Sequence, residues 1–267
     1  MKIAGILFVI AIIILIYLII RYLFKQTVAL TGLLNGQTST QISAATLSNN
    51  PNINANANNF AYSIWFYIQD WNYRYGEQKI IFGRMSNPYT SAPSELVASS
   101  GKDPSPVVFL DGLENNIIIA LGCYPGANQV PENNSSNNLG NNMGSPIVTS
   151  NATVDFCKVN NVPIQRWVNL LISVYGRTLD VYMDGKLVKT CLLPGVAMVN
   201  TSADLYLTPA GGFNGWTSKL QYFPNPINPQ QAWNIYTKGY GTSIFNNNYQ
   251  IKVSFDENGQ TKSYFTI

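Results

Sequence analysis

From Phe60 onward the sequence consists of short runs in which apolar and polar residues alternate, and this pattern restricts the chain to β-strands. In the first run, FAYSIWFYIQD, the even-numbered residues from 62 to 68 are apolar and share one face, while the odd-numbered residues from 63 to 69 share the other. A period of two with many aromatic residues is typical of a strand with one buried face. Eight further runs follow: KIIFGRM, PVVFLD, NNIIIALG, TVDFCKV, RWVNLLISVY, TLDVYMDGKLVKTCLL, ADLYLT and WTSKLQYF. The sequence therefore predicts an all-β fold of two packed antiparallel sheets, a jelly-roll sandwich.

Two dipeptides mark tight turns between such runs. Asp184-Gly185 divides TLDVYM from KLVKTCLL, and both central positions of a type I′ turn need a positive φ. Asn258-Gly259 likewise separates Tyr249–Phe255 from Thr261–Ile267, so we expect a hairpin at the end of the chain.

One short helix is predicted before that hairpin, in NPQQAWNIYTKG. Asn228 is a good N-cap and Pro229 suits the first helical position. Gly239 fits the position after the helix, where a left-handed conformation is common.

The N-terminus carries a different signal. Ile3 to Ile20 is an unbroken apolar run if Gly5 and Tyr17 are counted with it, and its length as a helix approaches the roughly 30 Å of a hydrocarbon core. A cleaved signal peptide is the alternative, but its apolar region is about 7–15 residues long and ends in a small-x-small site. We therefore expect a transmembrane anchor over residues 1–25, with residues 3–24 in the bilayer and a single-pass membrane localisation.

Composition divides the rest of the chain. Residues 26–59 are rich in Asn, Ser and Thr, include the low-complexity stretch NNPNINANANN, and read as a flexible linker. We expect the sandwich to occupy residues 60–241 and the C-terminal hairpin extension to occupy residues 242–267.

Charge and residue types exclude several classes of function. Only 11% of residues are charged, the net charge is +3, and no basic cluster lies outside the membrane flank, so we expect no nucleic-acid partner. There is no histidine, which removes the commonest general base and the commonest zinc ligand. No phosphate-binding loop is present.

Four segments resemble, in this order, parts of the concanavalin-A-like lectin/glucanase superfamily, in particular its laminin-G-like domains: FAYSIWFYI, IIFGR, VPIQRWVNLLISVYGRTLDVYMDGKLV and GGFNGWTSKLQYFPNPINPQQAWNIYTKG. The resemblance covers about two-thirds of the chain. The apolar N-terminal run, together with Cys-x-Val-x-x-x-Pro-x-Gln-x-Trp, also resembles membrane-anchored virion proteins of large DNA viruses.

The superfamily resemblance implies that its matching residues build the fold and not a reactive site. The expected fold-core residues are Trp65, Trp167, Tyr182, Asp184, Gly185, Phe213, Gly215 and Trp233.

The same resemblance places Cys157 and Cys191 on either side of the core unit, where the sheets could bring them together. We expect a disulfide between them, which would close a loop of about 33 residues. A Cys123–Cys157 bond is an open alternative, as are three reduced thiols.

Glucanases of this superfamily carry acidic residues on one strand, as in Glu-x-Asp-x-x-Glu, so that two carboxylates face one cleft. The nearest approach here is Asp111 and Glu114, which straddle a turn. We therefore expect no catalytic residues and no enzymatic activity.

Related lectins use calcium held by Asp and Asn oxygens. A weak calcium site is conceivable at Asp70, Asp103, Asp111 and the Asn133–Asn142 loop, but the expected cofactor content is none. Candidate glycan-binding residues are Trp71, Tyr73 and Asp111.

The sequence leads to two hypotheses for function. The first is a non-catalytic structural protein, a membrane-anchored minor capsid protein or membrane-to-capsid linker of a large DNA virus. It would sit in the virion internal membrane with its domain facing capsid or other structural proteins. The alternative is a membrane-displayed module for glycan binding or adhesion.

Overall fold

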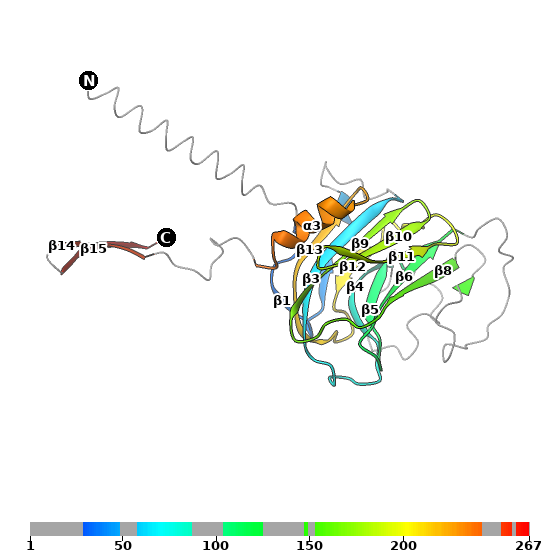
Figure 1. Ribbon diagram of the computed structural model, residues 1–267, viewed down its shortest axis with the longest axis horizontal. Helices are drawn as coiled ribbons and strands as arrows, with labels where there is room; N and C mark the ends of the chain where they lie inside the picture. The colour runs from blue at the N-terminus through cyan, green and yellow to red at the C-terminus, as the bar shows by residue number, and fades with distance from the viewer. Residues whose placement is uncertain are drawn as a thin grey trace, which may run out of the picture. The chain divides into compact units, whose positions relative to one another are not determined.

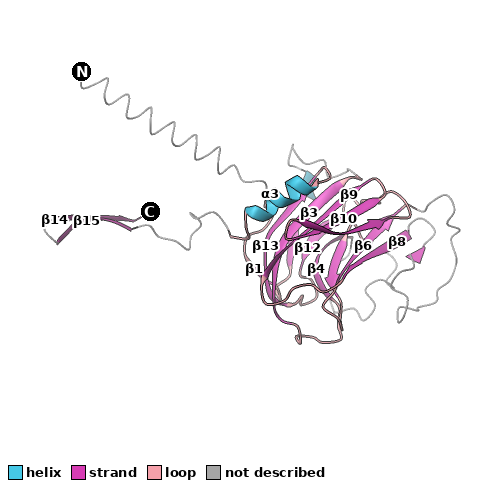
Figure 2. Ribbon diagram, in the orientation of Figure 1, coloured by secondary structure: helices cyan, strands magenta, loops and turns pink. Residues whose placement is uncertain are grey.

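The computed structural model describes residues 29–48, 58–86, 104–124, 147–148 and 153–241, together with two strands between 252 and 266. It divides into two units, of which Ala29–Tyr240 is the larger. This larger unit is a two-sheet β-sandwich, as the period-two pattern predicts (Figures 1 and 2).

Each sheet of the sandwich is antiparallel throughout its described pairings. The six-stranded sheet has the order β1 (Leu34–Asn35), β13 (Asn214–Phe223), β3 (Phe60–Asp70), β9 (Trp167–Tyr175), β10 (Thr178–Met183) and β11 (Lys186–Leu192). The seven-stranded sheet has the order β2 (Thr40–Ile42), β12 (Asp204–Leu207), β4 (Lys79–Met85), β5 (Val107–Leu110), β6 (Ile117–Cys123), β8 (Thr153–Val159) and β7 (Ile147–Val148).

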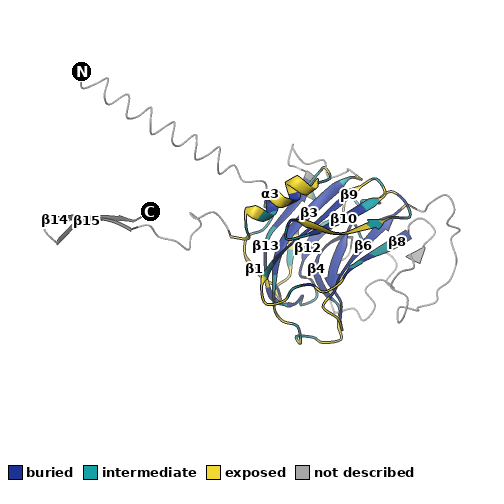
Figure 3. Ribbon diagram, in the orientation of Figure 1, coloured by how far each residue is buried: buried dark blue, intermediate teal, exposed yellow. Residues whose placement is uncertain are grey.

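The hydrophobic core lies between the two sheets, and Figure 3 shows most of their strands buried. Strand β3 contributes Tyr62, Ile64, Phe66 and Ile68 to this core, which is the face that the sequence pattern assigns to it. Its odd-numbered residues therefore lie on the outer face of the six-stranded sheet, because successive side chains of a strand alternate.

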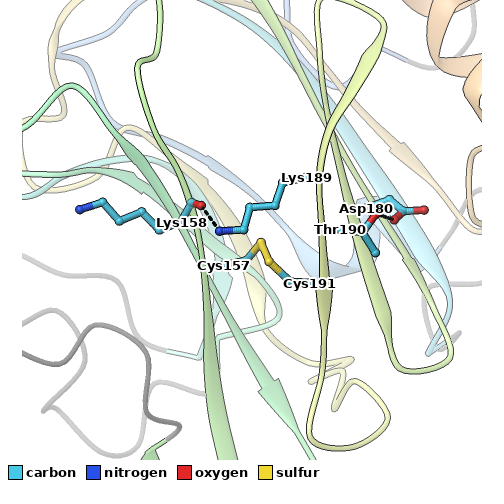
Figure 4. Close-up of a disulfide and its surroundings, with 6 residues drawn as sticks. All are labelled: Cys157, Lys158, Asp180, Lys189, Thr190 and Cys191. Atoms are coloured by element: carbon cyan, nitrogen blue, oxygen red, sulfur yellow. Dashed lines mark hydrogen bonds between the residues drawn. A yellow bond between two sulfur atoms is a disulfide. The ribbon is translucent and has the colours of Figure 1, made fainter.

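A disulfide between Cys157 and Cys191 links the sheets, which confirms the predicted pairing (Figure 4). Cys157 belongs to β8 and Cys191 to the edge strand β11, and their Cα atoms are 6.0 Å apart. Beside it, Lys189 Nζ on β11 donates a hydrogen bond of 2.7 Å to the Lys158 carbonyl on β8. Two adjacent links thus hold β11 against the opposite sheet. Cys123 is a buried free thiol.

The short helix α3 (Pro229–Thr237) begins where the sequence predicts. The Asn228 side chain accepts a hydrogen bond of 2.8 Å from Gln231 N, and Gln231 Oε1 accepts one of 3.0 Å from Asn228 N. This reciprocal capping box satisfies two amides at the start of the helix. At the other end, Gly239 has a φ of +67°, which suits a residue without a Cβ.

The turn between β10 and β11 also agrees with its prediction. Asp184 and Gly185 have φ values of 51° and 74°, so both central positions are left-handed, as a type I′ turn requires. One Asp184 carboxylate oxygen accepts a hydrogen bond of 2.9 Å from Asn169 N, and the other is paired with Arg166. The carboxylate fixes the turn to the neighbouring strand β9.

The boundary between linker and sandwich differs from the prediction. Residues 29–48, expected to be a flexible linker, belong to the sandwich: β1 pairs with β13, β2 pairs with β12, and the short helix α2 (Ala44–Ser48) buries Leu47 completely. The two strands are only two and three residues long, which is too short for an alternating pattern to show in the sequence.

The predicted membrane localisation, a single-pass anchor in a virion internal membrane, is contradicted. No helix among the described residues has both the length and the apolar character needed to cross a bilayer. The apolar run of residues 3–20, and with it the expected anchor over residues 1–25, lies outside the described residues.

The second unit is described only through its hairpin of β14 (Lys252–Glu257) and β15 (Gln260–Thr266). These strands are antiparallel, and Glu257 is the register partner of Gln260, so the connection holds two residues, 258 and 259.

Candidate functional site

A cleft of about 480 Å³ lies on the outer face of the six-stranded sheet. Its volume falls within the range of about 300–1,000 Å³ that is usual for small-molecule sites. Four of its six lining residues are aromatic, and none is charged; they are Leu33, Tyr67, Gln69, Trp167, Trp216 and Tyr240.

The floor of the cleft is a row of aromatic residues that crosses three neighbouring strands. Trp216 on β13 is the register partner of Tyr67 on β3, and Tyr67 is the register partner of Trp167 on β9. Adjacent strands lie about 4.8 Å apart, so the backbone positions of the two tryptophans are separated by roughly 10 Å. We call Trp216, Tyr67 and Trp167 the aromatic row.

Tyr240 forms a wall of the cleft at the β9 end of the row. Its ring is stacked on that of Trp167, with centroids 4.3 Å apart and planes 11° from parallel. It also meets the ring of Trp65 edge-on at 5.9 Å, and Trp65 in turn stacks on Tyr236 of α3 at 5.5 Å. The Tyr240 carbonyl accepts a hydrogen bond of 2.8 Å from Ser218 Oγ. The helix and the residues that follow it therefore hold this wall in place.

The cleft leaves large aromatic surfaces uncovered. Trp216 is 41% exposed and Tyr240 is 44% exposed, whereas Trp65, on the same face of the sheet, is only 5% exposed. Within the described part of the chain, the indole N–H groups of Trp167 and Trp216, the phenol of Tyr67 and the amide of Gln69 make no hydrogen bond. The cleft thus combines exposed aromatic surface with polar groups that make no hydrogen bond within the described part of the chain.

Gly215 lets β13 come close to β3 beside the row. A Cβ at this position would lie 1.9 Å from the Tyr67 carbonyl oxygen, much closer than atoms in van der Waals contact. The register shifts between Asn214 and Gly215, next to Trp216. The absence of a side chain at Gly215 therefore allows the two strands to approach closely beside Trp216.

The residues that the sequence favours for glycan binding do not line this cleft. Trp71 is half-buried against the core, with Lys79 Nζ 5.1 Å from the centre of its ring. The Tyr73 hydroxyl donates a hydrogen bond of 3.3 Å to the Gly211 carbonyl. Asp111 is buried and lies 3.3 Å from Lys158 Nζ. All three are occupied by contacts within the fold.

The acidic residues considered for catalysis or calcium binding are also engaged. Lys158 Nζ lies 3.0 Å from Glu114 and 3.3 Å from Asp111, and the hydrogen bond from Lys158 lowers the pKa of the Glu114 carboxyl. Asp70 is exposed and accepts a hydrogen bond of 2.9 Å from Asn72 N. Among the described residues, no three acidic, cysteine or histidine side chains are grouped so as to hold a metal ion. Asp103 and residues 133–142 lie outside the described residues.

Of the predicted fold-core residues, Trp65, Tyr182, Gly185, Phe213 and Gly215 are buried. Asp184 is half-buried at its turn. Trp167 is half-buried and lines the cleft instead of the inter-sheet core, because it lies on the outer face of β9.

Trp233 does not belong to the core and is 43% exposed. Helix α3 buries Ala232 and Ile235 against the sheet, and successive residues of a helix point about 100° apart. Trp233 therefore points away from that face, and its ring lies above the Asp184-Gly185 turn, 3.1 Å from where a Cβ of Gly185 would be.

One signal for the cleft is present in the sequence. The outer face of β3 carries Trp65 and Tyr67, where a solvent-facing strand surface usually carries polar residues. The register that aligns Trp216, Tyr67 and Trp167 comes from strands distant in the chain, so it could not be read from the sequence.

No family model matches this sequence, and no curated protein matches it. Among solved structures, the chain is similar to the receptor-binding domain of botulinum neurotoxin C/D mosaic serotype, with 12% identity over 80% of this chain and 44% of that one and a TM-score of 0.50. It is also similar to the receptor-binding domain of botulinum neurotoxin D, with 11% identity over 80% and 45% of the two chains and a TM-score of 0.48.

A third similar structure is domain 4 of an extracellular arabinanase from Geobacillus stearothermophilus, in complex with arabinotriose. It has 12% identity, covers 76% of this chain and 75% of that one, and has a TM-score of 0.45. This chain spans less than half the length of the neurotoxin domains. At these identities the likeness shows the fold alone, and that fold is a β-sandwich.

Proposed function

We propose that the sandwich is a non-catalytic carbohydrate-binding module whose ligand binds in the aromatic cleft. The observation that carries this proposal is the aromatic row, in which Trp216, Tyr67 and Trp167 are aligned by strand register, with Trp216 41% exposed. A rigid sheet presents these rings without ordering a loop, which reduces the entropic cost of binding.

The chemistry of the cleft suits a sugar. The C–H faces of a sugar ring pack against aromatic faces, and its hydroxyls need donors and acceptors around the edge of that contact. The indole N–H groups, the phenols of Tyr67 and Tyr240 and the amide of Gln69 are available for this purpose. An apolar peptide would use the rings but would leave these polar groups without partners, which is costly on burial.

This proposal takes up the alternative hypothesis from the sequence. The comparisons support it better than the leading hypothesis of a minor capsid protein or membrane-to-capsid linker, for which they offer no support. The neurotoxin domain of the same fold is named for receptor binding, and a binding role is compatible with this chain as well.

The non-catalytic part of the proposal rests on the carboxylates. Asp111 and Glu114 share the single ammonium group of Lys158, and neither lines the cleft. A glycosidase needs two carboxyl groups that face the same sugar from one cleft. The six residues that line this cleft include no acid.

A glycan array probed with the full chain tests the proposal, with variants Trp216→Ala and Trp233→Ala as a matched pair. Both side chains are exposed to a similar degree, at 41% and 43%, but only Trp216 lines the cleft. We expect selective glycan binding by the wild type and by Trp233→Ala, and at least ~10-fold weaker binding by Trp216→Ala. Absence of binding to any glycan, or equal losses in the two variants, would refute the proposal.

A further inference from the structure

The aromatic row has a direction, and that direction limits the shape of the ligand. Register partners lie opposite each other, so a line through Trp216, Tyr67 and Trp167 crosses the strands at a right angle and does not follow any one of them. A single sugar ring covers about one aromatic side chain, whereas the row presents three.

The two ends of the row differ. On one side the register continues from Trp216 to Asn35 on β1, the edge strand of the sheet, where Leu33 is 54% exposed. On the other side the row stops at Trp167, where Tyr240 stacks on the indole. A chain-like ligand can therefore leave the cleft over the sheet edge at β1 but meets a wall at Tyr240.

The charge of the cleft lining also bears on the ligand. Its lining residues are all neutral, and no described ammonium or guanidinium group lines it. Arg166, which directly precedes Trp167 in the sequence, is exposed and is paired with Asp184 in the β10–β11 turn. A carboxylate or sulfate placed on the row would lose its water of hydration without gaining a cationic partner, which is unfavourable.

Resting on the proposed function, we infer that the ligand is a neutral oligosaccharide chain that lies across the strands, with one sugar unit against the stacked pair of Trp167 and Tyr240 and another on Trp216. The roughly 10 Å between these positions corresponds to two strand spacings. The first and third of three consecutive units in an extended sugar chain are separated by a comparable distance, so Tyr67 lies under the middle unit.

Binding of β-1,4-linked gluco- and manno-oligosaccharides, from the monosaccharide to the hexasaccharide, tests this inference by isothermal titration calorimetry on the full chain. Oligogalacturonides of the same lengths serve as anionic probes. We expect the affinity for a neutral series to rise at least ~10-fold between the monosaccharide and the trisaccharide, because further rings become stacked. It should then level off, since additional units extend beyond the sheet edge. The oligogalacturonides should bind more weakly than the neutral series.

The variant Trp216→Ala tests how much of the affinity depends on the Trp216 end of the row. It should bind the trisaccharide at least ~10-fold more weakly than the wild type, because the ring under one end of the chain is lost, and it should lose the gain between monosaccharide and trisaccharide. Trp233→Ala should keep that gain, and thermal unfolding of both variants followed by circular dichroism excludes misfolding as the cause. Affinity that does not depend on length, a preference for oligogalacturonides, or an undiminished gain in Trp216→Ala would overturn the inference.

The two proposals fail separately. If the array detects a glycan whose binding requires Trp216 but the neutral series show no length dependence, the extended-chain inference is wrong and the binding module stands. If the array detects no glycan at all, the proposed function itself is wrong.

Discussion

Tyr240 and Trp167 come from distant parts of the chain, yet their rings stack with centroids 4.3 Å apart and planes 11° from parallel. The contact joins the segment after helix α3 to strand β9 and closes one end of the cleft. Because this end of the cleft is formed by the single side chain of Tyr240, one substitution is enough to measure its contribution to binding.

Substituting Tyr240 with alanine should weaken binding of the array-identified glycan by ~10-fold, because a stacked ring beside the ligand is lost. Tyr240→Phe keeps the ring and should stay within ~3-fold of the wild type. Since Tyr240 is 44% exposed, the unfolding temperature should change little. Tyr75→Ala, at a residue 61% exposed and outside the cleft, is the control. Equal losses for Tyr240→Ala and Tyr240→Phe would assign the effect to the hydroxyl and contradict the stacking role.

Gly215→Ala should destabilise the sandwich by about 1–3 kcal/mol, the typical cost of inserting atoms into a well-packed region. The new methyl would lie 1.9 Å from the Tyr67 carbonyl oxygen, so strands β13 and β3 would have to separate. Urea unfolding of the full chain measures the change. Gly32→Ala is the matched control, because a Cβ at Gly32 would meet no atom within 4 Å. Comparable midpoints for the two variants would show that the close approach at Gly215 is not required.

The number of thiols that can be alkylated should rise in two steps, first when the protein is unfolded and again when it is reduced. Burial raises the pKa of Cys123 to about 12, so the native chain should react negligibly with iodoacetamide at pH 8. Denaturation should expose one thiol and subsequent reduction should expose three, because Cys157 and Cys191 are joined. Mass spectrometry of the alkylated chain counts them. Three alkylated thiols without a reductant would contradict the disulfide.

Removing the disulfide should also lower stability. Cys191→Ala opens a loop closed by residues 34 apart in sequence, for which a loss of about 2–4 kcal/mol is typical. The loss should appear in urea unfolding of the unreduced chain. Adding a reductant should destabilise the wild type and leave the variant unchanged.

The pH dependence of stability offers a test at Asp155. Burial raises the pKa of this carboxyl, so the folded state holds the proton more tightly than the unfolded state does. The stabilising contribution of Asp155 is therefore full below the unfolded pKa of about 3.9 and is lost as the pH rises through the higher folded value. At pH 7 Asp155→Asn should be more stable than the wild type, and the difference should shrink towards pH 3.

The substitution Glu114→Gln should change the stability at pH 7 in the opposite direction to Asp155→Asn. The pKa of Glu114 is lowered by its hydrogen bond from Lys158, so its contribution is present at neutral pH and is lost as the pH falls. This variant should be slightly less stable than the wild type at pH 7. A gain in stability at pH 7 for Glu114→Gln, or a loss for Asp155→Asn, would contradict these assignments.

The full chain should not hydrolyse β-glucans or galactans, because its candidate carboxylates lie away from the cleft and are paired with Lys158. Reducing-sugar assays over a wide pH range check this expectation. Turnover that Asp111→Asn or Glu114→Gln abolishes would show that these two acids are catalytic.

The sequence was most informative where a pattern is local. The bounds of β3 and β4 agree with the alternating runs FAYSIWFYIQD and KIIFGRM, and the inward face of β3 was assigned correctly. The caps of α3 and the positive φ values at Asp184 and Gly185 also follow from neighbouring residues. The disulfide was predicted because its two cysteines flank a unit with a recognisable family pattern.

The sequence was least informative where structure depends on distant partners. Strands β1 and β2 are defined by pairing with β13 and β12, and nothing in their two or three residues indicates a strand. The cleft needs Trp216 and Trp167 to fall in register on either side of Tyr67, a relationship among three separate strands. Trp233 was misplaced because an aromatic residue on a short helix can face either way, and the sheet selected Ala232 and Ile235 instead.

The pairing of β1 with β13 and of β2 with β12 has a consequence for biosynthesis. The sandwich begins at Ala29, but the partners of its first two strands lie at residues 204–223, near its other end. A ribosome must therefore synthesise almost the whole unit before either early strand can pair. Such dominance of distant contacts slows folding and leaves incomplete chains with unpaired strand edges. Nascent chains released before β13 should depend on chaperones, and folding should complete only after translation has passed that strand.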